Sequence, residues 1–119
     1  MNLLFYGKTE DRAGKRFQRM VESIVPKKER NVYQTIYDLS ARLRRPTEEP
    51  AITVLLASSR EDLLDILSIR ELLCDTRVIL ILPDSEVGTV EKGHTLRPRF
   101  MTFSDNDFSE VVAVLGKML

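Results

Sequence analysis

The sequence is poor in the residues that build metal centres and nucleophilic sites. Its 119 residues include a single cysteine, Cys74, and a single histidine, His94. One cysteine forms neither an internal disulfide nor a cysteine-based zinc site. One histidine excludes a multi-histidine metal site and leaves any serine nucleophile with one candidate base. We therefore expect neither a metal centre nor a hydrolytic triad.

The sequence also lacks long apolar runs and an excess of charge. No stretch approaches the roughly 18 consecutive apolar residues of a membrane span, and the first apolar stretch is too short for a signal-peptide core. The 18 basic residues balance the 18 acidic ones, which argues against a general polyanion binder. We expect a cytoplasmic domain with no membrane contact and no nucleic-acid partner.

The zero net charge hides an asymmetry along the chain. Residues 1–60 carry 12 basic and 7 acidic side chains, a net charge of +5, and residues 61–119 carry the opposite excess. Such a dipolar molecule suits association through complementary patches. The basic residues that suggest nucleic acid lie near the ends of the first two predicted helices, where the helix dipole also favours them. They are Lys27, Lys28, Arg30, Arg42, Arg44 and Arg45.

Five short apolar segments alternate with five amphipathic ones. The apolar segments predict strands over Asn2–Tyr6, Asn31–Gln34, Ala51–Ala57, Arg77–Leu82 and Phe100–Phe103. The third and fourth are apolar without alternation, which is typical of parallel strands buried on both faces. Helices are predicted over residues 9–25, 35–45, 63–73 and 86–92, the fourth closed by Gly93, and after the cap at Asp105–Asp107.

This alternation predicts one α/β domain with a doubly wound, five-stranded parallel sheet and helices on both faces. At this length the flavodoxin-like strand order 2-1-3-4-5 is the natural choice. In such a sheet, functional residues gather at the carboxyl ends of the strands. The sequence has no glycine-rich phosphate loop, since Gly7 stands alone, and we expect no cofactor.

The whole-chain pattern resembles the receiver domain of two-component response regulators. The similarity covers the apolar third strand AITVLLA, the leucine-rich third helix and the amphipathic segment FSEVVAVLGKML. Receivers hold Mg²⁺ with an acidic pair after strand one and accept a phosphoryl group on an Asp at the end of strand three. A Ser or Thr after strand four and a Lys after strand five bind the phosphoryl oxygens.

At each of these positions the sequence departs from the receiver pattern. Strand one is followed by Gly7 and Lys8, and no Asp occurs between Ala51 and Arg60. No Lys comes directly after strand five, the nearest being Lys117 in the last helix. The resemblance therefore implies a degenerate receiver without phosphoacceptor or enzyme activity, acting through a protein partner or homodimer in bacterial signalling. The residues expected in its degenerate pocket are Lys8, Ala57, Ser58, Asp84, Ser104 and Asp105.

Individual pocket residues leave alternatives open. Ser58 and Ser59 stand where the acceptor would be, and they fit either a helix cap or a phosphorylated or nucleophilic serine. Lys8 is either an exposed lysine or the partner of Asp84 or Asp105. The alternative function is a small-ligand-binding or catalytic flavodoxin-like domain that uses the crevice at the carboxyl ends of the strands.

Two surfaces are candidates for a partner. The third helix is apolar around more than one face, so we expect Leu64 or Ile69 to project beyond the stripe that packs on the sheet. The other candidate is the face that receivers use for dimers, made by helix four, strand five and helix five. Its charged residues here are Arg97, Arg99, Asp107 and Glu110.

Overall fold

The computed structural model describes residues 2–8, 12–45, 51–105 and 108–118, and their centre is a five-stranded sheet. Every pair of neighbouring strands is parallel, in the order β2-β1-β3-β4-β5. The predicted flavodoxin-like α/β fold is therefore confirmed. The strands are β1 (Asn2–Tyr6), β2 (Arg30–Tyr33), β3 (Ala51–Leu56), β4 (Arg77–Leu82) and β5 (Phe100–Phe103).

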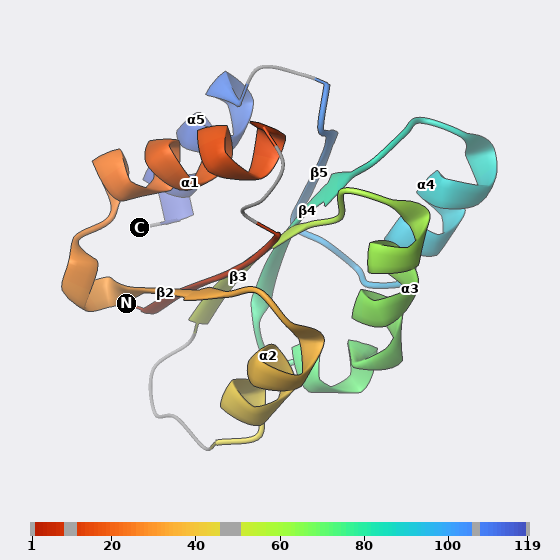
Figure 1. Cartoon of the computed structure of the whole chain (residues 1–119), viewed down its shortest axis with the longest axis horizontal. Coiled ribbons are helices and arrows are strands. Elements are labelled where there is room, and N and C mark those ends of the chain that lie inside the picture. The colour runs from red at the N-terminus through yellow and green to blue at the C-terminus, as the bar shows by residue number, and fades with distance from the viewer. Residues whose placement is uncertain (1, 9–11, 46–50, 106–107, 119) are drawn as a thin grey trace.

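Helices cover both faces of this sheet. α1 and α5 lie together on one face, and α2, α3 and α4 lie on the other (Figure 1). Each helix follows a strand in a parallel sheet, so the first turns of all five helices gather at the carboxyl edge. The helices are α1 (Arg12–Ile24), α2 (Ile36–Leu43), α3 (Arg60–Ser68), α4 (Val87–His94) and α5 (Ser109–Met118), with short 3-10 turns η1 (Lys27–Glu29) and η2 (Arg70–Leu73).

A separate apolar core lies on each face of the sheet. Under α1 and α5, the Phe17 ring stacks on Phe5 at 5.3 Å between centroids and meets Phe108 edge-on at 4.9 Å. Under α2 and α3, Leu39, Leu63 and other buried side chains pack together. All six residues of β3 are buried because its side chains enter both cores in turn. This burial explains the uninterrupted apolar runs of the central strands.

The third helix is shorter than its sequence predicts. It ends at Ser68, because Ile69 leaves the helical conformation (φ −113°, ψ 19°) and the chain continues as η2. Of Leu64 and Ile69, one of which was expected to project from the surface, Ile69 does not, because it is only 9% exposed and packs into the second core. Leu64, by contrast, is 52% exposed.

Gly93 does not end the fourth helix as predicted. It lies inside α4, which is capped by Thr95. A Cβ atom at Gly93 would come within 3.0 Å of the Met101 Sδ atom and 3.1 Å of a methyl group of Leu80. The missing side chain therefore allows α4 to approach the sheet closely. The predicted cap at Asp105–Asp107 falls partly outside the described residues.

Smaller differences concern the ends of strands. β2 begins and ends one residue earlier than predicted, and β3 ends at Leu56 rather than Ala57. Among the described helices, none is both long enough and apolar enough to cross a membrane.

Candidate functional site

An ion pair joins β1 to α3 at the carboxyl edge of the sheet. Lys8 lies two residues beyond β1, and Asp62 is the third residue of α3. The Lys8 Nζ atom lies 2.9 Å from Asp62 Oδ1. The Lys8 side chain is 53% exposed, whereas the Asp62 side chain is 3% exposed. The carboxylate is therefore buried and the lysine covers it from the solvent side.

The start of α3 explains why Asp62 points inward. Ser59 caps the helix, and its hydroxyl oxygen accepts a hydrogen bond of 3.2 Å from the Asp62 backbone N–H. The Ser58 backbone N–H in turn donates to Asp62 Oδ2 at 3.1 Å. This arrangement resembles a capping box whose returning hydrogen bond reaches one residue further back. Both oxygens of Asp62 are thus engaged, and the interpretation of Ser59 as a helix cap is confirmed.

The ion pair also affects the titration of neighbouring groups. The hydrogen bond with Asp62, followed by the negative charge of Asp62, raises the pKa of Lys8. Burial raises the pKa of the Tyr6 phenol, and the carboxylates of Asp62 and Asp65 raise it further. At neutral pH Lys8 is therefore cationic and the Tyr6 phenol is neutral.

A second polar network ties α3 to the loop before α4. Asp84 Oδ2 accepts a hydrogen bond of 3.1 Å from Arg60 Nε, and Asp84 Oδ1 accepts one of 3.0 Å from the Glu86 backbone N–H. Arg60 also pairs with the Glu86 carboxylate. A hydrogen bond from Thr89 and the one from the Glu86 N–H lower the pKa of Asp84. Asp84 is therefore an ionised group that orders the start of α4.

The structure divides the predicted pocket between these two networks. Lys8 was expected to be either an exposed lysine or the partner of Asp84 or Asp105; its side chain is 53% exposed, and its partner is Asp62 instead. Asp84 pairs with Arg60 instead. Sequence reasoning treated Asp62 only as part of a helix start, although a carboxylate three residues after a capping serine is the signal that marks it.

The other predicted pocket residues are mostly structural. Ala57 is fully buried, and its N–H donates to the Ile81 carbonyl oxygen at 2.9 Å. The Ser104 N–H donates to the Leu82 carbonyl oxygen at 2.9 Å, which continues the pairing of β4 with β5. The Ser58 hydroxyl is buried and has no hydrogen-bond partner among the described residues. Asp105 is exposed.

The described residues offer no metal centre. Within residues 2–8, 12–45, 51–105 and 108–118, no three His, Cys, Asp or Glu side chains are grouped so that they hold a metal ion. One cavity of about 580 Å³ lies on α1, and another of about 360 Å³ lies beside η2 and the end of α4. Neither is lined by Lys8, Ser58 or Asp84.

The charged residues predicted for a dimer face lie at opposite ends of β5. Arg97 and Arg99 precede this strand, whereas Glu110 follows it in the first turn of α5. All three are exposed. Arg97 has a positive φ of 51°, the only one among the described non-glycine residues. Asp107 lies outside the described residues.

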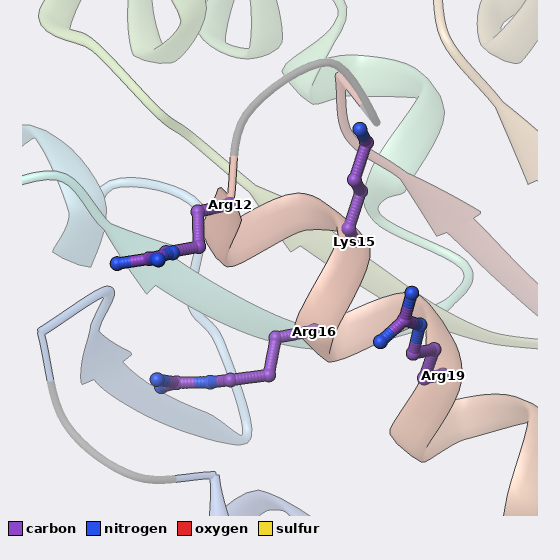
Figure 2. Close-up of a pocket in the computed structure, with 4 residues that line it drawn as sticks. All are labelled: Arg12, Lys15, Arg16 and Arg19. Atoms are coloured by element: carbon purple, nitrogen blue, oxygen red, sulfur yellow. The ribbon is translucent and has the colours of Figure 1, made fainter.

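A basic face on α1 was missed in the sequence. Arg12, Lys15, Arg16 and Arg19 line the cavity of about 580 Å³. Figure 2 shows Arg12 and Arg16 extending roughly parallel to each other, while the side chains of Lys15 and Arg19 extend in a different direction. Their spacing of i, i+3, i+4 and i+7 is the readable signal, because it places four residues on one side of a helix.

Arg30, one of the six basic residues near the ends of the first two helices that suggested nucleic-acid binding, has a structural role. One nitrogen of its guanidinium group donates to the carbonyl oxygens of Glu22 at 3.1 Å and Val25 at 2.7 Å. These carbonyls belong to the end of α1 and the residue that follows it, which a cation stabilises. Arg44 and Arg45 are exposed beyond the end of α2.

The fold and the site together define a class of protein. The chain is an α/β domain with flavodoxin-like topology. Its carboxyl edge carries a buried carboxylate that a lysine and a backbone N–H hold in place. Comparison of the chain with protein-family models, curated proteins and solved structures finds no match.

Proposed function

We propose that this chain is a non-catalytic, receiver-like signalling module that lacks a phosphoacceptor and acts by binding a protein partner. The observation that carries the proposal is the state of Asp62. Its carboxylate belongs to α3 rather than to a strand end, it is 3% exposed, and both of its oxygens are already engaged.

Phosphoryl transfer to a carboxylate makes demands that this edge does not meet. The nucleophilic oxygen must reach phosphorus, and cations must neutralise the charge that approaches it. The positions that follow β3 hold Ala57 and Ser58, which supply no carboxylate. The nearby cation, Lys8, is already paired with Asp62. These contacts support a module whose surface is fixed without phosphorylation.

The ion pair also supports a constitutive mode of action. In the receivers that the chain resembles, a hydroxyl after strand four and a lysine after strand five bind the phosphoryl oxygens. Here Lys8 and Asp62 supply a neutralised pair at the same edge from within the chain. The domain therefore has one arrangement of this edge to present to a partner, and control of binding comes from the partner or from the amount of protein.

The alternative is a small-ligand-binding or catalytic domain that uses the same crevice. One observation favours it: the buried Ser58 hydroxyl has no hydrogen-bond partner among the described residues. Thermal-shift measurements with nucleotides and flavins separate the two functions. A concentration-dependent rise in melting temperature that Ser58→Ala abolishes supports the alternative.

Phosphorylation of the full chain tests the main proposal. The protein is incubated with acetyl phosphate and Mg²⁺, and its intact mass is followed over time. We expect no phosphoryl adduct. A saturable, acid-labile adduct contradicts the proposal, and Asp62→Asn and Asp84→Asn then identify which carboxylate accepts the group.

A further inference from the structure

The basic face of α1, formed by Arg12, Lys15, Arg16 and Arg19, is the strongest charged feature that the proposed function leaves unused. These residues lie on one side of the helix and span about 10 Å along its axis at 1.5 Å per residue. They line the cavity of about 580 Å³ described above. No ion pair joins Arg12, Lys15 or Arg19 to another described residue.

Their arrangement disfavours the isolated helix. Like charges three and four residues apart repel each other, and Lys15 forms such a pair with both Arg12 and Arg19. A neutralising partner would relieve this repulsion in the folded domain. The cationic face is therefore better suited to a complex than to the free protein.

One of the four side chains is held in place by the core. The Arg16 guanidinium lies 4.8 Å from the centroid of the Phe108 ring. Phe108 is 5% exposed and packs edge-on against Phe17. A cation over an aromatic face is attracted by the ring. Arg16 is therefore positioned before any partner arrives, which lowers the entropy lost on binding.

We propose that the basic face of α1 binds a carboxylate-rich acidic segment of a protein partner; this deepens the proposed function and rests on it. Three of its four cations are arginines, whose planar guanidinium groups can donate two parallel hydrogen bonds to one carboxylate. Arginine is also enriched at the centres of protein interfaces. A helix that carries glutamates at i, i+3, i+4 and i+7 has the matching length and spacing.

The surroundings of the basic face favour a protein over a nucleic acid. The face runs toward Glu22 at the end of α1, and the adjacent α5 carries the exposed Glu110. The face offers four cations, which suit a short acidic segment but are fewer than the roughly 6–10 contacts of a protein that binds an extended phosphate backbone. The ring nearest the face, Phe108, is buried and offers no platform on which a base stacks.

Fluorescence anisotropy with a designed probe tests this proposal. The probe is a labelled 14-residue helical peptide with glutamates at i, i+3, i+4 and i+7, and its glutamine counterpart is the control peptide. The test variant combines Arg12→Glu, Lys15→Glu and Arg19→Glu. The matched control combines Arg42→Glu, Arg44→Glu and Arg45→Glu, which changes the net charge by the same amount at the end of α2.

We expect the wild-type protein to bind the glutamate peptide and not the glutamine peptide. The α1 variant should bind at least tenfold more weakly, and the α2 variant should stay within twofold of wild type. Circular dichroism checks that each variant folds. Lys15→Gln with Arg19→Gln gives a milder version, for which we expect an intermediate loss.

Four results overturn the proposal. The first is that the wild type does not bind the peptide, and the second is that both triple variants lose the same amount of affinity. The third is tighter binding of a 20-base-pair DNA duplex than of the peptide at 150 mM salt, and the fourth is self-association that the α1 variant abolishes. The third result assigns the face to nucleic acid and the fourth to a second copy of the chain. A phosphoryl adduct with acetyl phosphate is read separately, so failure of the proposed function is distinguishable from failure of this inference.

Discussion

Removing the Asp62 carboxylate should destabilise the domain although the residue is charged and lies near the surface. In Asp62→Ala, the Ser58 N–H loses the acceptor that lies 3.1 Å away. Loss of a hydrogen bond to a charged acceptor costs about 1.5–3 kcal/mol, and loss of a negative charge from the first turn of α3 costs about 0.3–1 kcal/mol. Lys8 is half exposed and returns to water without a comparable penalty.

The removal of a buried charge offsets part of this cost, because the carboxylate no longer has to be desolvated. We therefore expect a net loss of about 2 kcal/mol in the free energy of unfolding. For a chain of this size that corresponds to roughly 6–12 °C in melting temperature. Asp62→Asn keeps an oxygen that accepts from Ser58 and should lose only about 1 kcal/mol.

Urea denaturation followed by circular dichroism measures these changes. The control is Asp65→Ala, which removes an exposed carboxylate from the same helix and should stay within about 0.5 kcal/mol of wild type. The slope against urea should not change among the variants, since the fold is unaltered. If Asp62→Ala and Asp65→Ala are equally stable, the buried ion pair does not stabilise the edge as argued here.

Three further predictions concern α4, α3 and Tyr6. Gly93→Ala should lower the free energy of unfolding by about 1–3 kcal/mol, because the new Cβ atom would come within 3.2 Å of three side chains. Gly88→Ala has nothing within 4 Å of its Cβ atom and should raise this free energy by about 0.5–1 kcal/mol in the same denaturation assay. Leu63→Ala should cost about 2–5 kcal/mol and Leu64→Ala less than about 1 kcal/mol, because these side chains are 1% and 52% exposed; equal losses would contradict the orientation of α3. The raised pKa of Tyr6 means that the fold favours the neutral phenol, so this contribution to stability is complete below the unfolded pKa of 10.0 and is lost as pH rises through the folded value. Tyr6→Phe should therefore flatten the fall in stability between pH 9 and 11 in parallel urea titrations. An unchanged slope would contradict this.

The order of elements could be predicted because burial leaves a direct mark on the sequence. β1 and β4 begin and end at the predicted residues, since buried parallel strands need continuous apolar runs, and the half-exposed edge strand β5 also keeps its predicted ends. The break at Ile69 has no such mark. Ile69 is apolar at a helical spacing, and the close of α3 depends on how the chain must turn back toward β4.

Gly93 shows a different limit. A glycine near the end of a helix usually marks its cap, and the sequence holds no sign that this one serves a close contact with the sheet instead. The distance between α4 and the side chains of Leu80 and Met101 decides its role. That distance is a property of the packed domain.

The sequence predicted where the candidate site lies better than it predicted which residues form it. The carboxyl edge and Lys8 follow from the topology, but the choice of Asp62 over Asp84 as the partner of Lys8 depends on the orientation of the first turn of α3. The basic face of α1 also has a readable spacing, but the apolar stripe on the same segment already accounts for a helix there and hides the basic pattern.

The central claim is that the carboxyl edge is held closed by contacts within the chain and takes no phosphoryl group. NMR with beryllofluoride and Mg²⁺, which together imitate a phosphorylated carboxylate, tests it most directly on the ¹⁵N-labelled chain. We expect the backbone resonances of Lys8, Ser58 and Asp62 to stay unchanged at saturating beryllofluoride. Saturable shifts confined to these residues and to the loop at Asp84 would contradict the claim.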